Sequence, residues 1–140
     1  MTLGSGAWHS EQNASETEPM RFIQMWIMPA ELGLKPSCEQ RVYTKDDRTD
    51  VLLEVLSPAG GPGVLVHREA RAFVSSLTAG AAVERAIPKG FGHYFYLISG
   101  NVELNGEKLS TGDAAKIRDE ASLAVRALEP SELITVEVEV

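Results

Sequence analysis

The sequence has 140 residues, of which 44% are hydrophobic and 24% are charged, and its net charge is −7. This length suits one domain with its own core and is too short for two complete ones, while the acidic balance argues against nucleic-acid binding. Cys38 is the only cysteine, and no apolar run approaches the roughly 20 residues that span a bilayer, so we expect a cytoplasmic protein without a disulfide or membrane contact.

The first segment with chemical interest runs from Gly4 to Asn13 and contains His9 and Glu11. Alternate side chains of an extended strand point to the same face, so His9 and Glu11 would face one cavity while Ser10 faces away. An imidazole and a carboxylate suit iron, manganese or zinc. The alternative is a polar N-terminal turn without a ligand, because a His-x-Glu pair often arises by chance.

Three segments of different character follow. Residues 13–19 are polar and acidic, which predicts a linker. Residues 20–28 carry apolar side chains on both faces of an extended strand, which is typical of a strand that is covered on both sides. Residues 29–36 predict a loop with a short helical turn, because two prolines and Gly33 interrupt any longer helix.

From Glu39 onward, short runs of β-forming residues alternate with turn residues. This rhythm is the signature of an all-β sandwich or barrel. The expected strands are Gln40–Tyr43, Asp50–Leu56, Gly63–Val66, Arg71–Leu77, Ala82–Ala86, His93–Ile98, Asn101–Leu104, Glu107–Leu109, Ala114–Arg118, Ser122–Ala127 and Glu132–Val138.

Two of these strands carry a more specific signal. Asn105-Gly106 predicts a type I′ hairpin turn, because that turn needs positive φ at both central residues. The C-terminal run alternates strictly and predicts a half-buried strand. Its two faces carry Ile134, Val136, Val138 and Val140 on one side, and Glu137 and Glu139 on the other.

Three separate blocks of the sequence closely resemble the pirin family: residues 1–11, residues 20–29, and Tyr43 after residues 39–41. Pirins are bicupins, and the resemblance covers essentially this whole chain but about the second half of a full member. It implies an all-β cupin fold, a double-stranded β-helix or jelly-roll barrel of the pirin C-terminal type. Residues 1–19 would be a remnant of the N-terminal cupin with a linker, and residues 20–140 the C-terminal barrel.

The same resemblance implies a metal role for the first segment. In the family, the N-terminal barrel binds iron through a His-x-His pair and a later histidine and glutamate. His9 and Glu11 match the later pair, so they would form half of a four-ligand site. We expect no cofactor in the isolated chain, and Fe(II) or another divalent metal where another chain completes the site. A natural truncation and a fragment of a longer protein would both produce this arrangement.

The second half of the chain resembles cupin motifs without their ligands. Residues 80–106 follow the first motif, whose glutamate position falls on His93 and whose two histidine positions fall on Ala86 and Pro88. The last histidine position of the second motif falls on Leu123. We therefore expect a structural barrel, in which His93 is a hydrogen-bonded wall residue rather than a ligand or a base.

Three functions are compatible with this sequence. The one we favour is a non-catalytic binding module that self-associates as a homodimer through the surface left by the missing barrel, or that contacts a protein partner. The second is a metal-dependent oxidoreductase similar to the quercetin 2,3-dioxygenases that bacterial pirins resemble, completed by another chain. The third is arm exchange, in which residues 1–13 pair with a neighbouring copy as an added strand.

Overall fold

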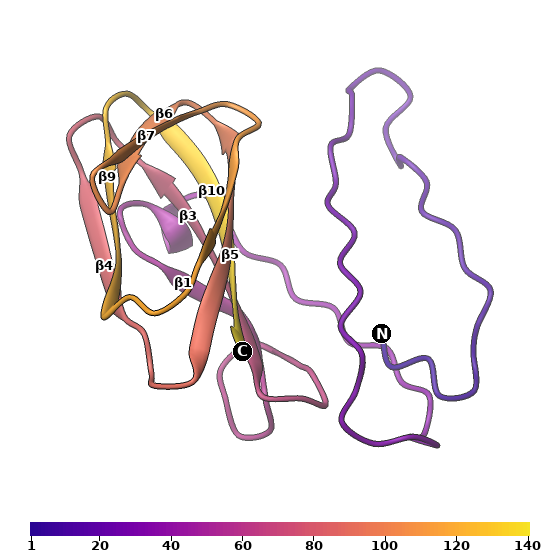
Figure 1. Ribbon diagram of the computed structural model, residues 1–140. Coiled ribbons are helices and arrows are strands. Elements are labelled where there is room, and N and C mark those ends of the chain that lie inside the picture. Colours follow the sequence, from indigo (N-terminus) through magenta and orange to yellow (C-terminus); the bar gives the residue numbers. More distant parts are fainter.

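The computed structural model describes residues 1–140. They divide into a β-barrel and an extended N-terminal arm, residues 1–41, beside it (Figure 1). No helix is long and apolar enough to cross a membrane. The elements are η1 (Asp46–Arg48), β1 (Leu53–Ser57), β2 (Val64–Leu65), β3 (Ala70–Leu77), β4 (Ala82–Ala86), β5 (Phe91–Ser99), β6 (Asn101–Leu104), β7 (Glu107–Ser110), β8 (Ala114–Ile117), β9 (Ser122–Ala127) and β10 (Ser131–Glu139).

The strands form two sheets that face each other (Figure 1). One has the order β2-β1-β3-β10-β5-β8 and the other the order β4-β9-β6-β7. β10 therefore lies in the middle of the larger sheet, antiparallel to both β3 and β5. The hydrophobic core fills the space between the sheets and consists of Leu77, Phe95, Leu97, Val102, Leu104, Leu109, Ile117, Leu123, Val125, Ala127 and Leu133.

The sequence predicts this β architecture well. The predicted strands at residues 82–86, 101–104 and 122–127 have the observed bounds, and seven others shift by a few residues. The hairpin turn is confirmed, because Asn105 has φ 47° and Gly106 has φ 90°. The strand of residues 40–43 and the covered strand of residues 20–28 are wrong, since neither segment forms a strand. A strand needs a neighbour for its backbone groups, and neither segment has one.

The C-terminal strand is half-buried as expected, but its fully buried face carries an acid. Leu133, Thr135 and Glu137 are completely buried, whereas Ile134 and Val136 are only partly so. Charged side chains are almost never fully buried unless they are paired. The partners of Glu137 come from three other strands, which the sequence alternation of β10 does not reveal.

The arm is closed on itself and then tied to the barrel. Thr2 and Ser37 exchange two backbone hydrogen bonds of 2.9 and 3.0 Å. Further along, the Glu39 carboxylate accepts a hydrogen bond of 3.2 Å from the Leu65 amide. The Arg41 guanidinium donates to the Glu39 carboxylate and to the Pro62 carbonyl. Residues 39–41 therefore fasten the arm to the loop around β2.

Candidate functional site

The two residues that the sequence predicts as metal ligands lie together on the arm. His9 Nε2 is 3.1 Å from Glu11 Oε1, and both side chains are partly exposed. Gln24, from the neighbouring part of the arm, places its Nε2 atom 3.5 Å from His9 Nε2. The His-x-Glu spacing thus brings an imidazole and a carboxylate to one place, as the alternation of an extended strand predicts.

This pair fits a divalent metal in its donor types, but it does not make a full set. Imidazole nitrogen and carboxylate oxygen suit iron, nickel or zinc. The structure contains no group of three or more His, Cys, Asp or Glu residues that could hold a metal ion. Metal binding by His9 and Glu11 therefore stays a prediction, and it requires ligands from elsewhere.

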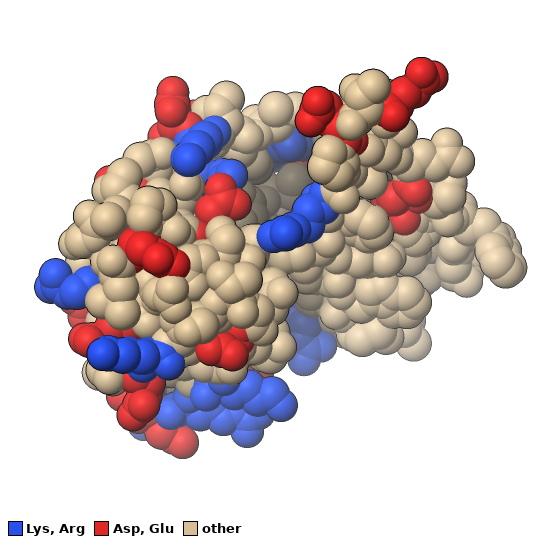
Figure 2. All heavy atoms as spheres, turned by 90° about the horizontal axis from the view of Figure 1, so that it is seen from above, with Lys and Arg blue, Asp and Glu red and all other residues tan.

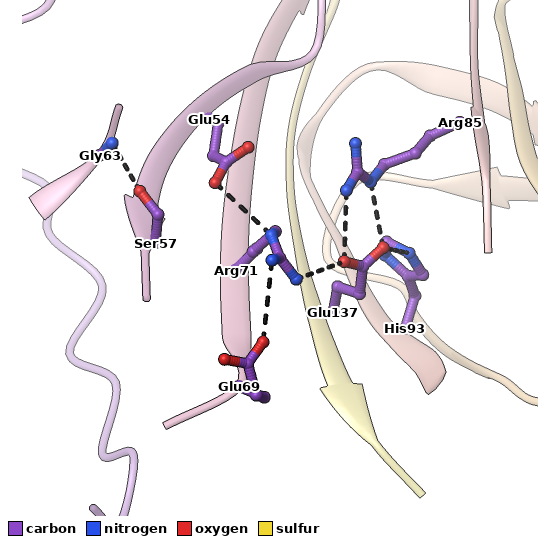
Figure 3. Close-up of polar contacts among 8 residues, drawn as sticks. All are labelled: Glu54, Ser57, Gly63, Glu69, Arg71, Arg85, His93 and Glu137. Atoms are coloured by element: carbon purple, nitrogen blue, oxygen red, sulfur yellow. Dashed lines mark hydrogen bonds and ion pairs between the residues drawn. The ribbon is translucent and has the colours of Figure 1, made fainter. Parts of the chain in front are cut away.

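A second polar cluster lies inside the barrel, and strand register builds it. Glu137 on β10 pairs with Arg71 on β3 and with His93 on β5. Residues directly opposite each other in antiparallel strands share one face of the sheet. Arg71 Nη1 lies 3.4 Å from Glu137 Oε1, and His93 Nε2 lies 3.2 Å from Glu137 Oε2. Three adjacent strands thus direct a cation, an anion and an imidazole into the barrel (Figure 3).

The opposite sheet contributes a second arginine. Arg85 on β4 meets Glu137 in a bidentate contact, with Nε 3.0 Å from Oε2 and Nη2 3.2 Å from Oε1. Its guanidinium carbon also lies 4.1 Å from the centre of the Phe73 ring, a cation–π geometry. The bidentate contact is the strongest form of arginine–carboxylate pairing, so it joins the two sheets across the barrel.

His93 is held from its other nitrogen. Nδ1 lies 2.9 Å from Thr135 Oγ1, and the histidine is buried. Nε2 is close to Glu137 but makes no aligned hydrogen bond, so that contact is mainly electrostatic. The prediction that His93 is a hydrogen-bonded wall residue is therefore confirmed.

The electrostatics of Glu137 follow from these contacts. Burial alone raises the pKa of a carboxyl, but the close contact with His93, the hydrogen bonds from Arg85 and the charge of Arg85 outweigh it and lower the pKa of Glu137 from its usual 4.5 to about 2. Arg71 also lies 3.7 Å from both Glu54 and Glu69 at the barrel edge. Glu137 is therefore charged at neutral pH although no part of it reaches solvent.

The sequence does not predict that Arg71, Arg85 and Glu137 form a cluster. The cupin ligand positions fall on Ala86 and Pro88, and both of these side chains face outward. The inward positions are one residue earlier, at Arg85 and Ile87, and Ile87 packs on the core. Leu133, Thr135 and Glu137 are alternate residues of β10 and so point to the same face of the strand. This is the only sequence signal that Glu137 faces the core.

An all-β barrel of two sheets with polar side chains directed inward has the architecture of a cupin. A family model described as the quercetinase C-terminal cupin domain, of the pirin group, matches residues 54–138. This range begins at the second residue of β1 and ends one residue before the end of β10. The chain therefore belongs to the pirin family and contains its C-terminal cupin, as the sequence resemblance predicts.

Curated relatives and solved structures agree. The chain is 34% identical to a pirin-like protein of Caulobacter vibrioides over 98% of its own length and 60% of that protein. It is 35% identical to the quercetin 2,3-dioxygenase of Escherichia coli K12 over 96% of its length and 57% of that protein. The crystal structure of YhhW from Escherichia coli superimposes with a TM-score of 0.73 at 31% identity, covering 81% of this chain and 47% of YhhW.

The extent of these matches limits what they say about activity. This chain spans about 60% of the length of the curated relatives that it matches. A structure of YhhW in complex with nickel(II), at 30% identity and a TM-score of 0.71, shows that a relative holds a metal ion. The cupin fold and the family are thus shared over the matched part of these proteins.

Proposed function

We propose that this chain is a non-catalytic binding module of the pirin family that associates with a second copy of itself through residues 20–28. The observation that carries this proposal is the exposure of large apolar side chains along that segment. Trp26 is 81% exposed, Met28 68% and Phe22 59%. Soluble monomers rarely leave a contiguous apolar patch of this kind open to water, and such patches are typical of protein interfaces.

The backbone of the same segment supports pairing. Residues 20–28 take part in no backbone–backbone hydrogen bond. Unpaired N–H and C=O groups of a chain segment are a template for an added strand. Arg21 is the only charged residue among residues 20–30, so charge repulsion between two copies would be small. The charged side chains in Figure 2 lie mainly over the barrel.

The test is the mass of the full chain in solution. We expect a dimer at micromolar concentration, and we expect the double substitution Phe22→Ser and Trp26→Ser to convert it into a monomer with an unchanged barrel by circular dichroism. Leu32→Ser is the matched control, because Leu32 is 92% exposed but lies outside the segment. A wild-type monomer, or a dimer that persists in the double variant, would contradict the proposal.

The alternative is a metal-dependent oxidoreductase resembling quercetin 2,3-dioxygenase, with its metal site completed by a second chain or a dimer. The 3.1 Å approach of His9 and Glu11 favours it, because this pair is ready to provide two ligands. The name of the Escherichia coli relative and the nickel bound to YhhW are consistent with such chemistry in longer family members. Exchange of arms between two copies would bring two His–Glu pairs together.

Metal content separates the two functions. If the chain is a self-associating module, we expect the same dimer with and without Fe(II). We also expect its metal content to be unchanged by His9→Ala and Glu11→Ala. Stoichiometric iron that disappears with this double substitution, together with turnover of a flavonol, would establish the alternative.

A cytoplasmic location is part of our proposal and is supported by the single cysteine, Cys38. A different protein in place of the second copy would appear as a monomer in the mass measurement.

A further inference from the structure

We propose that Arg85 is the resident cation of the barrel interior and that its guanidinium keeps divalent metals away from His93 and Glu137. This inference concerns the barrel alone and is independent of self-association through the arm. It deepens the non-catalytic part of the proposed function, because it gives the physical reason why a barrel with metal-ligand side chains would hold no metal.

The spacing of His93 and Glu137 is compatible with two ligands of one metal ion. Two ligand atoms about 2.1 Å from one metal ion are about 3.0 to 3.4 Å apart when the angle at the metal is octahedral or tetrahedral. His93 Nε2 and Glu137 Oε2 are 3.2 Å apart, and both side chains are fully buried. The Nδ1 contact with Thr135 fixes the ring with Nε2 directed at the carboxylate, as outer contacts do for metal-binding histidines.

The guanidinium of Arg85 occupies the carboxylate that a metal would need. Its Nε lies 3.0 Å from Oε2, the same oxygen that faces His93, and its Nη2 lies 3.2 Å from Oε1. The guanidinium carbon of Arg85 also lies 4.1 Å from the centre of the Phe73 ring. A metal ion would have to displace a bidentate ion pair and a cation–π contact at once.

Charge also opposes a metal. Arg71 and Arg85 both approach Glu137, so two fixed positive charges converge on one buried carboxylate. A divalent cation at Glu137 would be repelled by both guanidinium groups, and water reduces this repulsion only in part, because both arginine side chains are mostly buried. Glu54 and Glu69 lie 3.7 Å from Arg71 and offset part of its charge, so Arg85 is the cation that chiefly opposes a metal.

The test uses the full chain with His9→Ala and Glu11→Ala, which removes the arm pair as a metal site. In this background we expect no zinc retained after dialysis. Added Co(II) should not broaden the nuclear magnetic resonance signals of the His93 ring. This measurement needs no further variant. Adding Arg85→His removes the guanidinium and provides an imidazole from β4, so we expect about one retained zinc per chain and the visible absorption of Co(II) bound by nitrogen and oxygen.

Two comparisons assign the gained metal to this site. His93→Ala on top of Arg85→His should abolish binding, and Arg126→His, which places a histidine on the exposed side of β9, should bind none. Paramagnetic broadening of His93 in the background chain would overturn the proposal. A folded Arg85→His variant that binds no metal, or whose binding survives His93→Ala, would overturn it as well. None of these results depends on whether the chain is a monomer or a dimer.

Discussion

Glu137 is a charged residue whose side chain is completely buried. A carboxylate removed from water costs several kcal/mol, and this cost is recovered only where its partners are well placed. Here two guanidinium groups and an imidazole approach its two oxygens from β3, β4 and β5 (Figure 3). Removing one of these partners leaves the carboxylate of Glu137 buried with less compensation, so the groups around it act as a unit.

We predict that Glu137→Gln destabilises the protein in a pH-dependent way. The folded-state pKa of Glu137 is about 2, below its usual 4.5, so its stabilising effect is fully present above about pH 4.5 and is lost as the pH falls toward 2. The difference corresponds to at most about 3 kcal/mol, because Arg71 and Arg85 are partly exposed and water screens them.

Urea unfolding at two pH values measures this effect. The wild type should exceed Glu137→Gln in stability by about 2 to 3 kcal/mol at pH 7, and the gap should narrow toward about pH 3. Glu139→Gln is the control, because Glu139 lies on the same strand but is exposed. A gap that is equal at both pH values would mean that the loss comes from packing and not from the charge of Glu137.

The residue-scale predictions from sequence succeeded where local context was informative. His93 is followed by aromatic residues on a clear strand, and its role as a hydrogen-bonded wall residue follows from that context. Arg85 and Glu137 are separated by 52 positions and lie on different sheets. Their pairing depends on how the sheets face each other, which no local pattern of either strand specifies.

At the scale of elements, the turn between β5 and β6 shows how tightly the strands approach. Gly100 has φ 99°, and an added Cβ would overlap Ser131 Oγ and lie 2.7 Å from the carbonyl oxygen of Pro130. These contacts come from the beginning of β10, so Gly100 sets the distance between this turn and the central strand. Gly106 has φ 90° but has no atom within 4 Å of such a Cβ.

We predict that Gly100→Ala is clearly more destabilising than Gly106→Ala. Both substitutions place an L side chain in the left-handed region, which costs about 1 kcal/mol. Only Gly100→Ala adds overlap with the backbone of β10, worth about 1 to 3 kcal/mol more. Thermal unfolding of the two variants side by side provides the measurement, and equal melting temperatures would show that the β5–β6 turn relaxes without cost.

The segments that form strands as predicted and those that do not differ in one physical respect. Residues 82–86, 101–104 and 122–127 each pair with at least one neighbouring strand of the same chain, which accepts and donates backbone hydrogen bonds. Residues 20–28 have an equally apolar pattern but no neighbouring strand. Periodicity therefore predicts the tendency to extend, whereas pairing depends on another segment being available.

At the scale of the whole molecule, the arm and the barrel differ in how their backbones are satisfied. The central strand β10 is paired along both edges, while the amides of residues 20–28 donate no hydrogen bond. We predict that amide hydrogen exchange of residues 20–28 is near the rate of an unfolded chain in dilute, monomeric protein, and several orders of magnitude slower in β10.

Raising the protein concentration should change this pattern in one place. If residues 20–28 pair with a second copy, their exchange slows as the dimer forms, whereas exchange in residues 13–19 stays fast. The Phe22→Ser and Trp26→Ser variant should show fast exchange in residues 20–28 at every concentration. Protection of residues 20–28 in the dilute wild type would show that this segment is ordered within the single chain.

The sequence by itself determined the all-β class, most strand positions, the Asn105-Gly106 turn and the pirin resemblance, because these depend on local periodicity, turn chemistry and recognisable blocks of residues. It also placed His9 and Glu11 on one face, since their separation is two residues. Only the tertiary structure decided which face of β10 is buried and which cation meets Glu137. Those outcomes depend on strand register and on the approach of two sheets. There, a favourable cluster of charges outweighs the tendency of each charged side chain to stay in water.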